Sequence, residues 1–476
     1  MKKIAFVLLG GIFTLTTFAA DYVVISPKNY VELWTWYIGE RAKVHPEIKF
    51  AVKSAEEIYA TYQYGEGKDY RNAAESIHKY IRETAKTDGT KYFVLGGVWF
   101  DVQEPDEAGS LATGEEIDIN NAIPGIRAYP TVDSKDEGSF VNYPSDLFYA
   151  CHYIDNDAKS QYPWDPNGDG VYCTKGELNK KEYLEPSVVV ARMDFVPCDA
   201  WKDENGNKLN YEQLVRKYVG KLARGEAKDF AGRDKYVSNV NSLNDFDKEG
   251  WPDAMGIMQA RLDSIMAYRS VKELYMAACK NDSSNLPEII GKTMMGNWEV
   301  SLPFGHGIPE ACAYIGEEKF REQTGLIKFF MANIPCFTGT VTSFSHEAGL
   351  LPAIAQLSLS NPGGGSLASI NNTLYGQCTD CTTTKRYCGI SDELLDYTLD
   401  AYVRDGKMAG EAWKYAISTY VGIIYGENQE EEVKKRSCSI EEHLHYIQSA
   451  IVEEMLFGDP LIKLSPLHIA PRIIVK

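Results

Sequence analysis

Two residues that could serve as a nucleophile and its proton-transfer partner each follow an apolar stretch of the chain. His306 comes shortly after the run Trp298–Leu302, and Cys336 comes shortly after the run Leu326–Ala332. A thiol attacks as a thiolate, and a nearby imidazole can take its proton and later donate one to a leaving amine. The two residue types together therefore predict nucleophilic acyl-transfer chemistry.

The two apolar runs that precede these residues read as buried strands. In open α/β sheets the functional residues gather just beyond the carboxyl ends of neighbouring strands, which is where His306 and Cys336 would lie. Glycines stand close to both, and glycine lets a backbone approach a ligand closely. We expect the N–H groups of Gly307 and Cys336 to face the oxyanion of the reaction. The alternative is a structural Cys336, because cysteine is among the most buried residue types.

The rest of the chain alternates strand and helix patterns, which is typical of an α/β fold. We expect a mostly parallel sheet flanked by helices and built from two related halves. Further strands are predicted at Tyr22–Ile25, Lys91–Leu95, Ser187–Ala191 and Ser366–Ile370, and helices at Val31–Ala42, Ala73–Thr84, Tyr211–Leu222, Met255–Cys279, Ser345–Leu357, Asp392–Val403, Ala409–Ile424 and Ile440–Phe457.

Composition and charge exclude several classes of protein. Of the 476 residues 44% are hydrophobic, which indicates a folded globular chain. The net charge of −18 disfavours binding to nucleic acid. Residues 1–20 have a basic start, an apolar centre and small residues at the end, which predicts a signal peptide and export to the periplasm, cell surface or medium. No other segment is long and apolar enough to predict stable membrane insertion.

A loop rich in Asp, Asn and Gly has the spacing of a calcium site. Asp165, Asn167 and Asp169 place oxygen atoms at alternate positions, and the carbonyl of Val171 and the side chain of Glu177 could complete the set. Glu177 lies one place beyond the twelfth position of an EF-hand, so a true EF-hand is not expected. The alternative is a metal-free turn.

Several segments, in order along the chain, resemble the gingipain peptidases of the caspase-like clan. The resemblance is centred on Phe304–Gly307 and Ala332–Gly339 and extends to Tyr92–Gly97, Ser145–Tyr149, Val188–Arg192, Glu347 and Leu456–Pro460. It implies a caspase-like three-layer sandwich and a cysteine endopeptidase in which Cys336 is the nucleophile and His306 the general acid and base. Relatives of this kind often bind structural calcium.

The resemblance also suggests a third site residue and a division of the chain. In the gingipain pattern an acidic residue soon after the arginine is placed to orient the histidine, and Asp194 is the candidate here. Pro335 stands before the cysteine where a small residue is common. We expect an N-terminal α/β subdomain at 21–185 that carries the calcium-type loop, a catalytic subdomain at 186–466 and a C-terminal tail at 467–476.

The sequence therefore predicts an exported cysteine endopeptidase that forms a thioester at Cys336 and acts on protein or peptide substrates. One alternative on the same fold is a transpeptidase or sorting ligase, in which an amine replaces water. An alternative from another class is a catalytically inactive, calcium-dependent binding protein, because a fold does not guarantee chemistry. The residue preference at the cleaved bond stays open.

Overall fold

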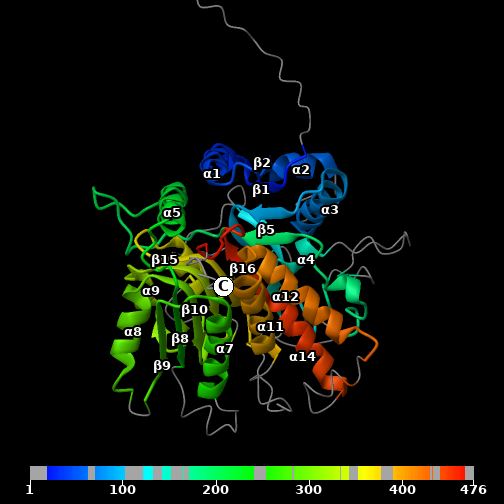
Figure 1. Ribbon diagram of the computed structural model, residues 1–476. Helices are drawn as coiled ribbons and strands as arrows, with labels where there is room; N and C mark the ends of the chain where they lie inside the picture. Colours follow the sequence, from blue (N-terminus) through cyan, green and yellow to red (C-terminus); the bar gives the residue numbers. More distant parts are fainter. Residues whose placement is uncertain are drawn as a thin grey trace, which may run out of the picture.

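The structure is a computed structural model whose centre is a single 10-stranded sheet (Figure 1). It describes residues 19–62, 70–101, 122–131, 142–151, 164–165, 171–240, 254–280, 283–332, 334–341, 352–376, 390–428, 431 and 440–466. The order of the strands is β2-β1-β3-β7-β16-β15-β14-β10-β8-β9.

Parallel pairing joins the strands within each half of this sheet. One half contains β2 (Phe50–Ser54), β1 (Tyr22–Ser26), β3 (Tyr92–Leu95), β7 (Val189–Arg192) and β16 (Glu454–Gly458). The other contains β15 (Gly365–Asn372), β14 (Leu326–Ala332), β10 (Trp298–Phe304), β8 (Lys235–Val240) and β9 (Glu273–Ala278).

The halves meet where β16 pairs antiparallel to β15, with Glu454 opposite Asn372. This reversal matters for the site, because the first residue of β16 comes to the same edge of the sheet as the last residue of β15. The carboxyl ends of β14 and β10 lie at that edge too. We call it the catalytic edge, and the end of β16 at Gly458 lies toward the opposite edge.

Helices flank the sheet and complete an α/β sandwich (Figure 1). The α5 helix packs on α1, β14 and β15, whereas α11, α12 and α14 cover β7, β15 and β16. The helices are α1 (Val31–Val44), α2 (Ala55–Tyr62), α3 (Tyr70–Asp88), α4 (Leu147–Ala150), α5 (Tyr211–Glu226), α7 (Ala254–Tyr268), α8 (Leu286–Met295), α9 (Glu317–Arg321), α10 (Ile354–Ser360), α11 (Ile390–Leu399), α12 (Ala409–Ile424) and α14 (Ile440–Glu453).

Two small sheets and three short helical turns complete the described part. The small sheets are β4 (Val98–Asp101), β5 (Ala122–Ala128) and β6 (Tyr143–Ser145), and β11 (Gly307–Ile308), β12 (Ala311–Cys312) and β13 (Ile315–Gly316). The turns are η1 (Lys28–Tyr30), η5 (Lys181–Tyr183) and η6 (Asp400–Arg404).

The structure confirms the predicted fold class but corrects the ends of two predicted helices. The predicted helix at 255–279 ends at Tyr268, and its second part is strand β9; the predicted helix at 440–457 ends at Glu453 and continues as β16. In both places pairing with a neighbouring strand overrides a local pattern compatible with helix. Strand β7, which follows the predicted division at 185, pairs with β3 of the N-terminal half of the sheet.

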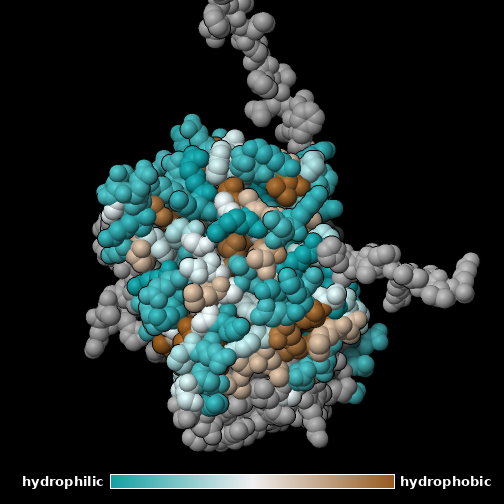
Figure 2. Space-filling view, turned by 60° about the vertical axis from the view of Figure 1, so that its left-hand side comes forward, coloured by the Kyte–Doolittle hydropathy of each residue, from teal (hydrophilic) through white to brown (hydrophobic). Residues whose placement is uncertain are grey.

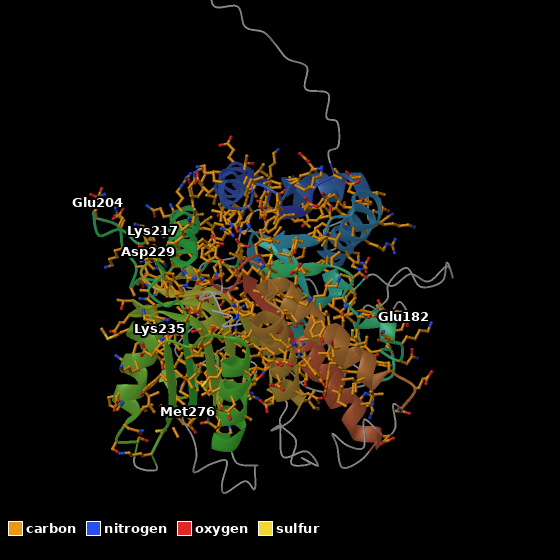
Figure 3. All side chains as sticks on the ribbon, in the orientation of Figure 1. Glu182, Glu204, Lys217, Asp229, Lys235 and Met276 are labelled. Atoms are coloured by element: carbon orange, nitrogen blue, oxygen red, sulfur yellow. The ribbon has the colours of Figure 1, made fainter. Side chains whose placement is uncertain are left out.

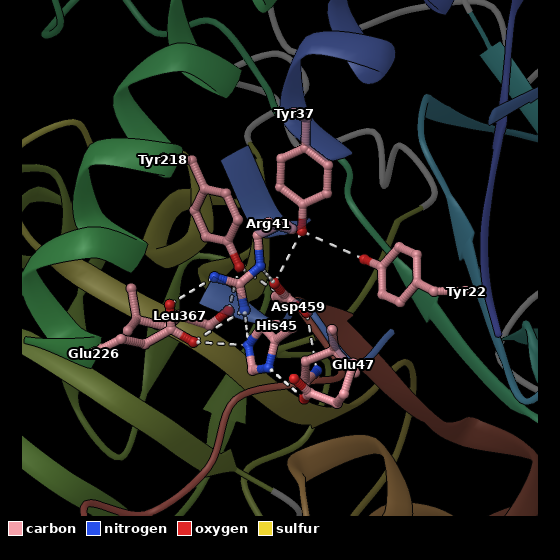
Figure 4. Close-up of polar contacts among 10 residues, drawn as sticks. Tyr22, Tyr37, Arg41, His45, Glu47, Tyr218, Glu226, Leu367 and Asp459 are labelled. Atoms are coloured by element: carbon pink, nitrogen blue, oxygen red, sulfur yellow. Dashed lines mark hydrogen bonds and ion pairs between the residues drawn. The ribbon is translucent and has the colours of Figure 1, made fainter. Parts of the chain in front are cut away.

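A buried cluster of charged and phenolic side chains holds α1, α5 and the end of β16 together (Figure 4). The Arg41 guanidinium lies 2.6 Å from Asp459 and donates to both oxygens of Glu226 at 2.6 and 2.9 Å. Tyr37 donates to Asp459 at 2.9 Å, and Tyr218 accepts the Asp459 N–H at 2.8 Å. We call these five residues the Arg41 cluster.

Charged side chains project from several parts of the described surface (Figure 3). Glu182, Glu204 and Lys217 are exposed and project outward (Figure 3). The face in Figure 2 is largely hydrophilic, with separate and smaller hydrophobic areas. No helix in the described ranges is long and apolar enough to cross a membrane.

Candidate active site

The structure brings His306 and Cys336 to the catalytic edge on neighbouring strands, as the sequence predicts. His306 follows β10 and Cys336 follows β14, and these two strands pair in parallel. The backbone of Gly307 touches the backbone of Cys336 so closely that a Cβ at position 307 would overlap with it. Glycine at 307 is therefore what allows the histidine loop and the cysteine loop to meet.

Cys336 lies in a tight turn whose next residue has a strained backbone. Phe337 has φ of +58°, the left-handed region in which a residue with a side chain costs roughly 1–2 kcal/mol. The Phe337 N–H donates to the Leu374 carbonyl at 2.5 Å, and the Phe337 carbonyl accepts from Thr340 at 3.1 Å. The Gly339 N–H binds the Asn372 carbonyl at 2.8 Å, so the chain after β15 holds the turn in place.

Backbone N–H groups surround the thiol of Cys336. Burial raises the pKa of the thiol to about 11, while hydrogen bonds from the N–H groups of Gly376, Cys336 and Gly307 act in the opposite direction. At neutral pH the resting thiol is therefore protonated. Gly307 and Cys336 are the residues whose N–H groups the sequence predicts to face the oxyanion. The sequence did not single out Gly376, which follows β15.

The sequence also failed to single out Glu453, a fully buried carboxyl whose charge would act on Cys336. Burial raises the pKa of Glu453 well above its usual value, and the neighbouring Glu454 raises it further, whereas the Leu374 N–H lowers it. Within the described part of the chain, neither oxygen of Glu453 accepts a hydrogen bond from another side chain. It reaches the catalytic edge because β16 runs antiparallel to β15, which no local pattern in the sequence indicates.

His306 is exposed, and the strands that follow it form a small antiparallel sheet beside the site. The His306 carbonyl accepts from Ala313 at 2.9 Å, which anchors the loop to the turn between β12 and β13. Ile308, Tyr314 and Tyr375 are exposed apolar side chains, with exposed fractions of 47%, 46% and 40%. The site is thus bordered by apolar surface on the histidine side and after β15.

Asp194, the predicted orienting acid, accepts hydrogen bonds from Gln356 and Trp99. Its Oδ2 accepts from Gln356 at 2.7 Å and from the Trp99 N–H at 3.4 Å. Burial raises its pKa to about 6, although the bond from Gln356 and the charge of Arg192 lower it. The structure therefore does not bring Asp194 into hydrogen-bonding contact with His306.

The calcium-type loop is only partly described. Asn167 and Asp169 lie outside the described residues, and so does Glu347 of the family resemblance. Asp165 is buried, and the adjacent Trp164 carbonyl accepts from Cys173 at 2.6 Å, which closes the loop between them. One oxygen of Glu177 accepts the Thr174 N–H at 2.8 Å. Within the described ranges no group of three acidic, His or Cys side chains is arranged to hold a metal.

Two of the motifs that resemble the gingipains meet in a buried ion pair. Arg192 donates from two nitrogens to the two oxygens of Asp146, at 2.7 Å each. It also donates to the carbonyls of Ile123 and Pro124 at 3.1 and 3.3 Å. These motif residues therefore fasten β5 and α4 to β7 and are structural in this chain.

Solved structures of gingipains share the fold. The Arg-specific cysteine proteinase gingipain R matches with a TM-score of 0.56 and 13% identity, over 95% of this chain and 80% of that one. A complex of the pro- and mature domains of gingipain RgpB from Porphyromonas gingivalis gives 0.56 and 13%, over 94% and 81%. A third structure, described as a protease, gives 0.53 and 11%, over 94% and 78%. The caspase-like α/β sandwich is thereby established.

The family follows from the sequence match. The model of Peptidase family C25 matches residues 16–465, and the chain belongs to this family. It is a cysteine-type endopeptidase of the gingipain type, and its substrates are therefore proteins or peptides. No curated protein matches the sequence.

Proposed function

We propose that this peptidase is exported and cleaves peptide bonds through a thioester at Cys336, with His306 as general acid and base. The observation that carries the proposal is the backbone contact between Gly307 and Cys336 at the ends of two paired parallel strands. It puts the only exposed histidine of the catalytic edge, within the described residues, on the loop next to the thiol.

The proposed reaction proceeds in two steps. The sulfur of Cys336 attacks the carbonyl carbon while His306 takes the thiol proton and passes it to the leaving amine, which breaks the C–N bond. Water then attacks the thioester carbonyl and gives a proton to His306. The C–S bond breaks, the acid product leaves, and His306 returns the proton to the sulfur of Cys336. A pKa of about 11 for the thiol supports a base acting during attack, because little thiolate exists beforehand at neutral pH.

Backbone donors support the stabilisation of charge in these steps. The N–H groups of Gly307, Cys336 and Gly376 already point to the sulfur in the resting protein. We assign them to the oxyanion that forms beside that sulfur. One such donor contributes about 3–4 kcal/mol in peptidases.

The replacement Cys336→Ala tests the proposal directly. It should abolish cleavage of an unfolded protein substrate and labelling by a thiol-directed peptide inhibitor. Cys279→Ala, which removes another free buried thiol at the end of β9, is the matched control and should retain both. Cleavage that survives in Cys336→Ala would refute the assignment, and analysis of products with an added amine separates hydrolysis from transpeptidation.

We also propose that the loop beginning at Asp165 binds structural calcium through Asp165, Asn167, Asp169, the Val171 carbonyl and Glu177. The support is the alternating oxygen spacing together with the closure of the loop beside the buried Asp165. Calcium should raise the unfolding temperature of the wild type and chelation should lower it, with the response lost in Asp165→Asn. Equal unfolding temperatures with calcium and with chelator would refute this site.

A further inference from the structure

The short helix α10 begins between the two catalytic loops and binds both of them. The N–H of Ile354 donates to the carbonyl of Pro309 at 3.1 Å, and the N–H of Ala355 donates to the carbonyl of Thr338 at 2.9 Å. Pro309 directly follows β11 of the histidine loop, and Thr338 lies in the turn of Cys336. The first N–H groups of a helix have no partner inside it, which leaves them available for these loops.

The side chain of Gln356 fixes the start of this helix. Its Oε1 accepts the N–H of Ala353 at 3.0 Å, and its Nε2 donates to Asp194 at 2.7 Å. Asp194 is fully buried and also accepts the N–H of Trp99 at 3.4 Å. The chain of contacts therefore runs from Asp194 through Gln356 to the first residues of α10.

We propose that Asp194 and Gln356 are positioning residues of the peptidase site, which set the spacing between the His306 loop and the Cys336 turn through the start of α10. The inference rests on the proposed roles of His306 and Cys336. It gives Asp194 a function that differs from orienting the imidazole, because the acid acts at a distance through a helix.

The need for such a device follows from the origin of the two reacting groups. They come from separate loops, and a misplacement of about 1 Å can lower a reaction rate by about 10²-fold. The bonds from Ile354 and Ala355 attach both loops to one rigid element. A shift of α10 would therefore move both loops and change how His306 meets Cys336.

The properties of Asp194 fit a functional role better than a purely structural one. Its Oδ1 makes no hydrogen bond within the described part of the chain, and burial raises its pKa to about 6. An apolar side chain at this position would leave the amide of Gln356 and the N–H of Trp99 without their acceptor. The hydrogen bond that Asp194 accepts therefore fixes the amide of Gln356.

The contacts also connect the halves of the molecule. Asp194 follows β7, and Trp99 belongs to β4, so both come from the N-terminal half of the chain, whereas α10 precedes β15 of the other half. The N-terminal half thus contributes to the geometry of a site whose reacting groups it does not supply.

The test compares Asp194→Ala, Gln356→Met and the double variant with the conservative Asp194→Asn in the full chain. Measured are kcat, KM, the rate of Cys336 alkylation and the unfolding temperature. The matched control is Ser360→Ala, which removes the 2.9 Å bond from the Val196 N–H at the other end of α10. It involves the same two segments but lies away from the catalytic loops.

We expect each of Asp194→Ala and Gln356→Met to lower kcat by about 10- to 100-fold while KM changes by less than about 3-fold. The double variant should be no worse than the poorer single variant, because the two residues act as one unit. Asp194→Asn should keep kcat within about 3-fold of the wild type, since its carbonyl can accept both N–H groups and its NH₂ takes the place of Oδ1. Ser360→Ala should lose stability and keep kcat.

Two outcomes would overturn the inference. One is a kcat for Asp194→Ala that matches the Ser360→Ala control. The other is an Asp194→Asn variant as impaired as Asp194→Ala, which would show that the negative charge matters and not the hydrogen bond. Alkylation of Cys336 reports on the loops even without a peptidase assay, so a failure of the proposed reaction is distinguishable from a failure of this inference.

Discussion

Strand β16 has a buried acid at each end, and the two acids differ in the side chains that contact them. Asp459, just beyond Gly458, is paired with Arg41 at 2.6 Å, accepts from Tyr37 at 2.9 Å and accepts the Leu461 N–H at 2.9 Å. Glu453, just before the strand, has no such side-chain partner in the described part of the molecule. One end of the strand is saturated with polar contacts and the other is not.

The difference indicates that the two ends of β16 have different roles, one in folding and one in the site. A buried charge is tolerated when partners compensate for lost hydration, and the Arg41 cluster does this at the end that joins α1, α5 and β16. At the catalytic edge the exposed imidazole of His306, the strained Phe337 and the buried Glu453 come from the chain next to β10, β14 and β16. Loss of the Arg41 cluster at the first end should therefore alter folding, and loss of the imidazole at the second should alter chemistry.

The largest expected effect is the loss of activity in His306→Ala. Removing the proton-transfer group should lower kcat by about 10²- to 10⁴-fold. The unfolding temperature should stay close to that of the wild type, because the side chain is exposed. Steady-state kinetics together with thermal unfolding check both parts, and a strongly lowered unfolding temperature would remove the contrast between the two ends.

The next largest effect is expected in Arg41→Met, which should lower stability and not the reactivity of Cys336. The change leaves the buried Asp459 and the partly buried Glu226 without their cation and should lower the free energy of unfolding by about 3–5 kcal/mol. The rate of Cys336 alkylation in the folded protein should not change. Lys43→Met, on the same helix but exposed, is the control and should cost less than about 1 kcal/mol. A comparable loss in both variants would contradict the assigned role of the cluster.

These contrasts also show how far the sequence could predict the molecule. The strands before His306 and Cys336 were recognisable because long apolar runs ended at residues with reactive side chains, and the parallel sheet followed from the strand and helix alternation. The position of Glu453 was not predictable, because it depends on the antiparallel entry of β16 next to β15. The partner of Asp194 was missed for a similar reason, since Gln356 meets it only through tertiary packing.

A smaller effect is the loss of folding stability at acidic pH that depends on Glu226. Burial raises the pKa of Glu226, but hydrogen bonds from His45 and Arg41 and the charge of Arg41 outweigh burial and lower it from 4.5 to about 2. A lowered pKa stabilises the fold above the unfolded value, and this stability is lost as pH falls from about 4.5 through about 2. The loss should be about 3 kcal/mol by denaturant unfolding and should be absent in Glu226→Gln.

The last effect has the opposite sign and is expected for Glu453→Gln. A carboxyl whose pKa is raised in the folded state stabilises the fold fully below its unfolded pKa, and that contribution is lost as pH rises toward the folded pKa. Glutamine carries no such proton, so Glu453→Gln should gain stability relative to the wild type as pH rises above 4.5. Unfolding by denaturant at several pH values measures this gain. A relative loss over the same range would mean that Glu453 is ionised and compensated, and the two ends of β16 would then be alike.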